Sequence, residues 1–133
     1  MSAGQLHHIE LYVSDLERSA SFWSWFLTKL GYTEYQRWAA GRSYILGSTY
    51  IVLVQVSERH KKTYNRCNVG LNHLAFQAES QAQVDELTTE LQKRGMTILY
   101  QDKHKNPKNS QHRAVYFEDP DRMKVELIAP DCQ

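Results

Sequence analysis

The sequence lacks several features that would assign it to a specialised class of protein. It has no apolar run near the ~20 residues that span a bilayer, and its formal net charge of +1 gives no excess of one sign. The opening segment MSAGQLHHIE contains no basic stretch followed by an apolar one, as a secretory signal would. We therefore expect no membrane and no nucleic acid as partners, and we predict a cytoplasmic protein.

Cysteine and proline are also scarce, at two and three residues among 133. Cys67 and Cys132 form no metal-spaced motif, so we expect reduced thiols. The residues that are present, 41% hydrophobic with 11% aromatic, are enough to fill the compact core of one globular domain.

One internal repeat organises the chain. LHHIELYVSDLE at residues 6–17 is echoed by LNHLAFQAESQAQ at residues 71–83. The equivalent histidines, serines and glycines of the two copies are 65, 66 and 64 positions apart: His8 and His73, Ser14 and Ser80, Gly31 and Gly95. This constant spacing indicates a duplicated unit.

Each copy is predicted to run from a strand into a helix. Ser14 with Glu17, and Ser80 with Gln83, have the spacing of a capping box, which satisfies the unpaired donors of a first helical turn. Apolar residues three and four positions apart then form one stripe along each helix, and a glycine is expected to end it. The stripes are Leu16, Ala20, Trp23, Leu27 and Leu30 in the first copy, and Val84, Leu87 and Leu91 in the second.

Short β-rich runs follow each helix: TEYQRW, RSYILG and TYIVLVQV in the first copy, and TILY, HRAVYFE and KVELIA in the second. Each half is therefore predicted to be β-α-β-β-β. We expect a single α+β domain over residues 1–133, made of module 1 (about 5–57) and module 2 (about 69–130). The polar stretch QDKHKNPKNSQ, residues 101–111, is predicted to be a surface loop at the rim of a pocket.

Three polar side chains are predicted to share the open face of the sheet. Because side chains alternate along a strand, His8 is expected opposite the apolar set that packs on the helix, and His73 is its twin. In MKVELIAP, Glu126 stands between two apolar neighbours and points the same way. Two imidazoles and one carboxylate form a ligand set for a divalent metal that leaves positions for water or substrate. The alternative is scattered polar residues on a half-exposed sheet, but their matched placement in a duplicated framework favours the metal site.

The chain resembles the vicinal oxygen chelate superfamily, which includes glyoxalase I, extradiol dioxygenases and the fosfomycin and bleomycin resistance proteins. HIELYVSDLERSASFW resembles the family's first strand and helix, GLNHLAFQ its second-module strand, and VYFEDPDRMKVEL its closing hairpin. The resemblance implies two tandem βαβββ modules that form a cup-shaped, β-barrel-like sheet, with His8, His73 and Glu126 as metal ligands and His7 as a structural residue. It also implies a homodimer in which His8 of one chain meets His73 and Glu126 of the other.

The function implied by this resemblance is that of a divalent-metal-dependent enzyme. It would act on a small substrate with adjacent oxygen atoms, by isomerase, lyase or dioxygenase chemistry. Iron, manganese, zinc, nickel and cobalt all suit imidazole and carboxylate ligands, so the identity of the metal stays open. The alternative is a non-catalytic small-molecule binding or antibiotic-resistance protein. Bleomycin-type binding proteins have lost the metal residues that this chain keeps, which favours catalysis.

Tyr116 and His112 are the predicted catalytic residues besides the ligands. Tyr116 lies ten positions before Glu126, which is the spacing of a tyrosine that touches substrate in extradiol dioxygenases and fosfomycin resistance proteins. The alternative for Tyr116 is a cross-strand aromatic pair. His112 is a candidate acid or base near neutral pH, as is His60, although a histidine at a loop–strand junction is more often solvated.

The sequence departs from the family's patterns at three places. Glyoxalase I uses four protein ligands, and STYIVLVQV offers only Gln55 where the fourth is expected. The hairpin reads DPDR in place of DPDG, which puts Arg122 at a turn glycine. The glycine- and serine-rich cation loop of the fosfomycin transferases is missing from QDKHKNPKNSQ. Strand parity leaves open whether Trp38, Tyr44 and Tyr50 line the cup or pack beneath it. The basic clusters HKK at 60–62 and KHK at 103–105 are candidates to attract an anionic substrate, although charge on loops is usually only solvated.

Overall fold

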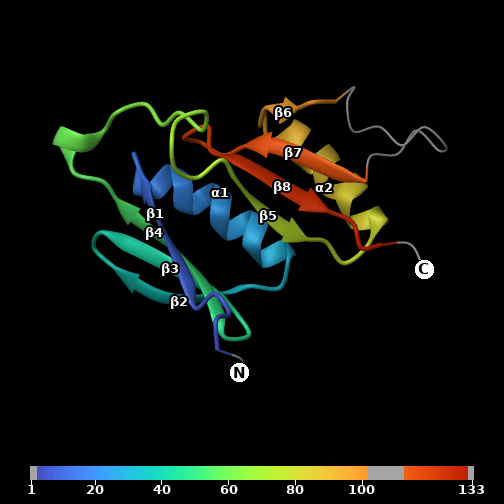
Figure 1. Cartoon of the computed structure of the whole chain (residues 1–133), viewed down its shortest axis with the longest axis horizontal. Coiled ribbons are helices and arrows are strands. Elements are labelled where there is room, and N and C mark those ends of the chain that lie inside the picture. Colours follow the sequence, from blue (N-terminus) through green and yellow to red (C-terminus); the bar gives the residue numbers. More distant parts are fainter. Residues whose placement is uncertain (1–2, 102–112, 132–133) are drawn as a thin grey trace. The chain divides into compact units, whose positions relative to one another are not determined.

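The computed structural model describes residues 3–101 and 113–131, and the chain divides into two compact units, Met1–Thr63 and Tyr64–Gln133. In each unit a helix lies along one face of a four-stranded sheet (Figure 1). Among the described residues, neither helix has the length and apolar character needed to cross a membrane. That the two modules act as one domain stays a prediction.

The first unit contains β1 (His8–Val13), α1 (Leu16–Lys29), β2 (Thr33–Trp38), β3 (Gly41–Leu46), β4 (Thr49–Gln55) and the 3-10 helix η1 (Glu58–His60). Its sheet has the order β1-β4-β3-β2, in which β1 runs parallel to β4 and the other pairs are antiparallel. The helix α1 packs on β2, β3 and β4. The most deeply buried side chains of this unit are Val13, Trp23, Phe26, Leu27, Tyr44 and Leu53.

The second unit repeats this architecture with β5 (His73–Gln77), α2 (Gln81–Lys93), β6 (Ile98–Leu99), β7 (Ala114–Glu118) and β8 (Lys124–Ile128). Its sheet has the order β5-β8-β7-β6, and β5 is again parallel to β8. The core of this unit is formed by Val84, Leu87, Leu91, Phe117, Val125 and Leu127. The same element sequence and the same strand order in both units confirm the predicted pair of βαβββ modules.

Both helices end at the predicted glycines. Gly31 and Gly95 have φ angles of 98° and 77°, a left-handed conformation that glycine adopts without steric cost. Beyond each glycine, the backbone N–H of Tyr32 or Met96 donates to the carbonyl five residues earlier, at 2.9 and 3.0 Å. These bonds are those of the Schellman motif, so the last turn of each helix has its free carbonyls satisfied.

The helix starts differ slightly from the prediction. Ser80 caps α2 as expected, because its hydroxyl accepts the backbone N–H of Gln83 at 3.1 Å. The cap of α1 is Asp15, whose carboxylate accepts the N–H of Arg18 at 3.1 Å, so the prediction of Ser14 was wrong by one residue. Serine and aspartate are both strong capping residues, and adjacent in sequence they compete for the same role. Ser14 instead accepts a hydrogen bond from the Arg18 guanidinium through its hydroxyl.

Candidate metal centre

Two of the three predicted ligands lie together in the second unit. His73 begins β5 and Glu126 lies on the adjacent strand β8, where Glu126 pairs with Ala75. Nε2 of His73 is 3.0 Å from Oε1 of Glu126, and the two side chains are 31% and 10% exposed. Alternation along each strand therefore brings an imidazole and a largely buried carboxylate together on one face of the sheet.

The second ring nitrogen of His73 is held by its neighbour in sequence. Nδ1 lies 2.7 Å from Oδ1 of Asn72. Each ring nitrogen of His73 therefore faces an oxygen, Nδ1 the side-chain carbonyl of Asn72 and Nε2 the carboxylate of Glu126. A ring nitrogen and a carboxylate oxygen that face each other this closely require a cation between them, either a proton or a metal ion. The donor set therefore fits a divalent metal.

Tyr116 lies beside this pair, as its strand parity predicts. It is the direct partner of Glu126 in the antiparallel β7–β8 pairing, and its ring centre is 5.8 Å from that of His73. Burial, and then the hydrogen bond with Glu126 and the charge of that carboxylate, raise the pKa of Tyr116 above its usual value of 10.0. Tyr116 is therefore a neutral phenol at physiological pH.

The third predicted ligand, His8, lies at the start of β1 in the first unit and is exposed. Its ring stacks on Tyr50, with ring centres 4.7 Å apart and planes 3° apart. Its Nδ1 is 2.8 Å from Nδ1 of His7. His7 precedes β1, so its side chain does not have to point to the opposite face from that of His8. This hydrogen bond fits the structural role expected of His7, and Nε2 of His8 lies outside it.

The position of the expected fourth ligand is corrected by the strand register. His8 pairs with Tyr50 and Glu10 with Val52, just as His73 pairs with Lys124 and Ala75 with Glu126. The first-unit equivalent of Glu126 is therefore Val52, not Gln55. Valine has no ligating atom, so the first unit offers no counterpart to the carboxylate.

Gln55 has a different role in the first unit. Its Oε1 accepts the backbone N–H of Leu16 at 2.8 Å, and its Nε2 donates to the carbonyl of Ser14 at 2.8 Å. The side-chain amide thus links the end of β4 to the start of α1, and its hydrogen-bonding groups are used there.

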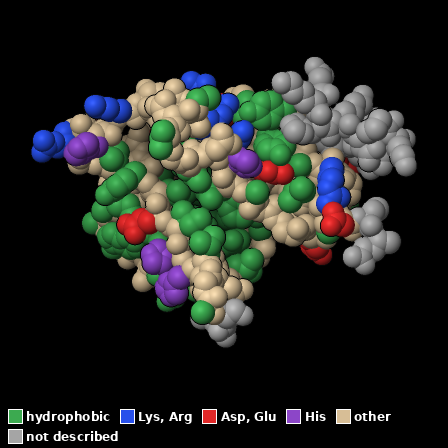
Figure 2. Space-filling model, viewed as in Figure 1, with side chains coloured by type: hydrophobic (Ala, Val, Ile, Leu, Met, Phe, Trp, Pro, Cys, Tyr) green, Lys and Arg blue, Asp and Glu red, His purple; other side chains and the backbone are tan. Residues whose placement is uncertain are grey.

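The remaining sequence candidates are distributed around both units. Within the described residues of each unit, no three His, Cys, Asp or Glu side chains gather into a metal site. His60 lies in η1, where its Nδ1 is 2.8 Å from the hydroxyl of Ser57 and basic side chains gather (Figure 2). His112 lies outside the described residues.

The three undecided aromatic residues of the first unit have separate environments. Tyr44 is 2% exposed and belongs to the core, and its burial raises its pKa. Tyr50 stacks on His8 as described above. Trp38 is 41% exposed, and its indole covers Gly41 so closely that a Cβ at Gly41 would lie 2.2 Å from the ring.

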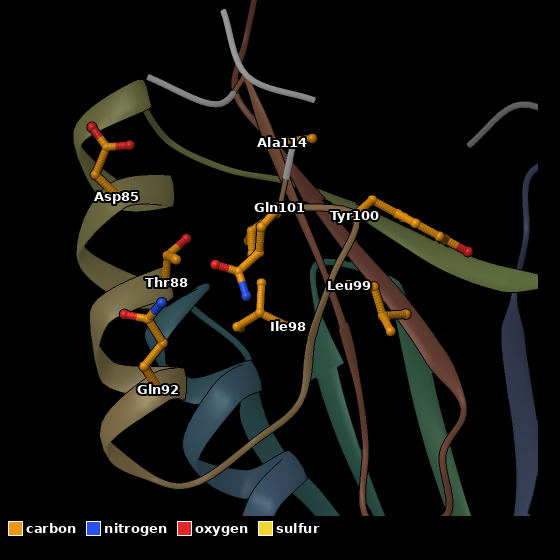
Figure 3. Close-up of a pocket in the computed structure, with 9 residues that line it drawn as sticks. Asp85, Thr88, Gln92, Ile98, Leu99, Tyr100, Gln101 and Ala114 are labelled. Atoms are coloured by element: carbon orange, nitrogen blue, oxygen red, sulfur yellow. The ribbon is translucent and has the colours of Figure 1, made fainter. Parts of the chain in front are cut away.

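A cavity of about 220 Å³ lies elsewhere in the second unit, between α2 and the strands β6 and β7 (Figure 3). Two of its polar side chains from α2 have local partners: Asp85 accepts from Gln81 at 3.0 Å, and Thr88 donates to the carbonyl of Val84 at 2.7 Å. The lining includes none of the three clustered residues described above. Tyr100 is part of the lining, and its ring centre lies 5.5 Å from that of Tyr116 beside the candidate metal centre.

Residues 5–127 match the family model of the Glyoxalase/Bleomycin resistance protein/Dioxygenase superfamily. The chain belongs to this superfamily. Its members commonly use divalent metal ions, and in this chain His73 and Glu126 provide a donor pair that fits such an ion.

Individual members of the superfamily match nearly the whole chain. It is 55% identical to the uncharacterised protein YqjT of Bacillus subtilis over 96% of this chain and 100% of YqjT. It is 31% identical to the glutathione transferase FosA of Serratia marcescens, over 92% of this chain and 78% of FosA. A protein from Bacillus halodurans whose crystal structure is named as that of a glyoxalase is 50% identical to this chain in sequence. The two structures match with a TM-score of 0.89 over 96% of this chain and 97% of that chain.

Sequence reasoning missed two residues that contact the cluster. Asn72 holds the ring of His73, and it directly precedes that histidine in the sequence. Lys124 lies two positions before Glu126, so the same alternation that placed Glu126 on the open face also predicts Lys124 there.

Proposed function

We propose that this protein is a divalent-metal-dependent enzyme that acts on a small substrate with adjacent oxygen atoms, by isomerase, lyase or dioxygenase chemistry. The observation that carries the proposal is the cluster of His73, Glu126 and Tyr116 on one face of the second sheet. A ligating pair beside a neutral phenol combines a metal site with a hydrogen-bond donor. Superfamily membership supports the same reading.

In this proposal His8, His73 and Glu126 hold the metal. When bound, the metal supplies Lewis acidity that polarises the oxygen atoms of a substrate. Asn72 keeps the ring proton of His73 on Nδ1 and so keeps Nε2 available as a ligand. The carboxylate of Glu126 is largely buried, which strengthens its attraction for a cation.

Tyr116 would touch the substrate. A tyrosine hydroxyl ordinarily keeps its proton at neutral pH, so the phenol can donate a hydrogen bond to a substrate oxygen on which negative charge develops. The rings of Tyr116 and His73 meet edge to face, which restricts the position of the phenol. His112 and His60 are the proposed candidates for an additional acid or base.

Two observations favour some of the superfamily's reactions over others. Val52 takes the place of an acidic fourth ligand in the first unit, which disfavours a glyoxalase I type of metal site with four protein ligands. The relative FosA is named a glutathione transferase, so transfer of a thiol to a substrate is one of the reactions to test. A binding protein that captures a small molecule without turning it over is the alternative function, and the screen described below separates the two.

Metal content tests the site directly. We predict about one divalent metal per chain in purified protein, and a loss of most of it in His73→Ala and Glu126→Gln, because each change removes a ligand. Elemental analysis by mass spectrometry measures this. His60→Ala and Glu86→Gln are matched controls on an exposed turn and an exposed helix face, and should keep the metal. Undiminished metal in both ligand variants would overturn the proposed site.

Turnover is tested by a screen of metal-reconstituted protein against catechols, methylglyoxal with a thiol, and fosfomycin with and without a thiol. We expect one class to be consumed, and Tyr116→Phe to lower kcat while retaining the metal, because only the donated hydrogen bond is lost. Thermal-shift measurements on the same compounds report binding. Stabilisation by a compound that is never consumed would favour the binding protein.

A further inference from the structure

Lys124 places a positive charge on the same sheet face as the candidate metal centre. It begins β8 two residues before Glu126, and its register partners are His73 on β5 and Glu118 on β7. Its ammonium lies 3.3 Å from the hydroxyl of Tyr100. The same nitrogen is 5.2 and 5.9 Å from the ring centres of Tyr100 and Tyr116.

The nearest carboxylates do not neutralise this charge. Glu118, directly opposite Lys124, is bound by Arg66 at 2.7 Å and by Arg122 at 3.5 Å. The carboxylate of Glu126 lies 3.0 Å from Nε2 of His73. Within the part of the chain that the structure describes, Lys124 forms no ion pair, and the carboxylate of Glu118 is paired with two arginine side chains. The group of Arg66, Arg122, Lys124 and Glu118 therefore carries an excess of positive charge.

Tyr100 is held in a strained conformation beside Lys124. Its φ of 54° is the left-handed region, which a bulky residue rarely adopts. Figure 3 shows its side chain extending away from α2, on the opposite side from Thr88 and Gln92. Strain of this kind persists only where the surrounding structure enforces it, and it concentrates at binding and catalytic sites. In this conformation the hydroxyl of Tyr100 lies within hydrogen-bond distance of the ammonium of Lys124.

We propose that Lys124 binds an anionic group of the substrate, a carboxylate or a phosphonate, while the remaining oxygens of that substrate reach the metal centre. Tyr100 is a positioning residue that holds the ammonium through its hydroxyl and its ring. This inference rests on the proposed function, because it assigns a substrate class to the same site. Residues two apart on a strand are about 7 Å apart, so the anionic group lies a few bonds from the metal-binding oxygens.

Among the described residues, the ammonium of Lys124 has aromatic and hydroxyl neighbours but no carboxylate partner. Aromatic rings attract an ammonium but accept its hydrogen bonds only weakly. The hydroxyl of Tyr100 provides one oxygen for the three N–H donors of Lys124, so the other donors are largely unused by it. An entering carboxylate or phosphonate would form charge-assisted hydrogen bonds with those donors, and these are stronger than neutral ones. A neutral substrate would gain nothing from Lys124.

The test uses metal-free full-length protein, titrated at constant ionic strength with methylphosphonate and, separately, with acetate. Chemical-shift changes in protein NMR spectra report the affinity. We expect saturable binding at one site, with Lys124→Met weakening it roughly tenfold or more, because a hydrogen bond to a charged group is lost. The ligand with the higher affinity identifies the anion class.

Matched variants make the result specific. Lys93→Met removes the same charge from the exposed last turn of α2 and should bind as the wild type does. Lys124→Arg keeps the charge and should retain binding, which guards against a Lys124→Met protein that folds poorly. Equal affinities in Lys124→Met and Lys93→Met, or no saturable binding in the wild type, would overturn the inference. Because no metal is present, these outcomes are independent of the metal-content test.

Discussion

Glu118 is a buried carboxylate that the sequence alone gives no reason to expect inside the protein. It is 8% exposed at the end of β7. Its carboxylate accepts a hydrogen bond from the guanidinium of Arg66, which lies 52 positions earlier in the sequence. Arg66 also donates to the carbonyl of Arg122 at 3.2 Å, which fixes the turn between β7 and β8. Arg122 itself has a φ of 66°, the conformation for which the family's usual glycine is suited. One ion pair therefore supports a strained turn at the start of the strand that carries Glu126.

Removal of this ion pair is predicted to be costly. Arg66→Met should lower the free energy of unfolding by about 2 kcal/mol, because it leaves a buried carboxylate without its main partner. Urea unfolding followed by circular dichroism measures the change. Arg37→Met is the control: its ion pair with Glu34 is on the surface, with side chains 62% and 44% exposed, and its loss should have little effect. Equal losses in the two variants would contradict the role assigned to Glu118.

Alternation along single strands was enough to predict which side chains of β7 and β8 share a face with His73. It placed Glu126 and Tyr116 on one face from a few neighbouring letters, and the structure brings both next to His73. The partner of Glu118 could not be predicted in the same way. An arginine 52 positions away is selected by the folded chain, and nothing local to either residue encodes the contact.

At the scale of elements, the side chain of Gln55 joins a strand to a helix. Its amide satisfies the backbone N–H of Leu16 in the first turn of α1 and the carbonyl of Ser14 before that turn. Free donors at a helix start require such a partner. Together with the Asp15 cap, Gln55 fixes where β1 ends and α1 begins, and so fixes the strand that carries His8.

Gln55→Leu is predicted to lower stability without affecting the metal. The substitution leaves one donor and one acceptor partly buried and unpaired, which should reduce the free energy of unfolding by about 1–3 kcal/mol. Gln92→Leu, on an exposed position of α2, should change it little. Metal content measured in the same preparations should be equal in both variants and in the wild type. A specific loss of metal in Gln55→Leu would restore Gln55 as a ligand candidate.

The elements themselves were largely predictable, whereas their pairing was not. Helix ends depend on local signals, and Gly31, Gly95 and Ser80 were read correctly. The strand register depends on contacts between distant segments, so the sequence did not show which residue of β4 is equivalent to Glu126. Gln55 was therefore expected at the fourth-ligand position that Val52 occupies. Two adjacent capping residues likewise could not be separated locally, so the start of α1 was placed one residue early.

At the scale of the whole molecule, the predicted ligands are divided between the two units. His73 and Glu126 belong to the second unit, and His8 belongs to the first. The superfamily resemblance implies that His8 is supplied by a second copy of the chain. A symmetric dimer would then contain two equivalent sites, each built from both protomers. Neither protomer would hold a complete ligand set alone.

Mixed dimers test this prediction. His8→Ala and Glu126→Gln proteins should each bind little metal. After reversible dissociation and mixing, a dimer with one chain of each kind regains one site, because the intact His8 meets the intact His73 and Glu126 across the interface. Random pairing makes half of the dimers mixed, so roughly a quarter of all sites should recover metal. If all three ligands came from one chain, mixing would restore nothing.

A second mixture provides the control for this experiment. His73→Ala and Glu126→Gln damage the same side of a shared site, so no arrangement of the two chains rebuilds a complete set of ligands. Metal content should therefore recover in the first mixture and stay low in the second. Equal recovery in both mixtures would show that exchange does not repair the sites through His8. A monomer in light scattering at micromolar concentration would contradict the shared site itself, since it leaves His8 no second chain to meet.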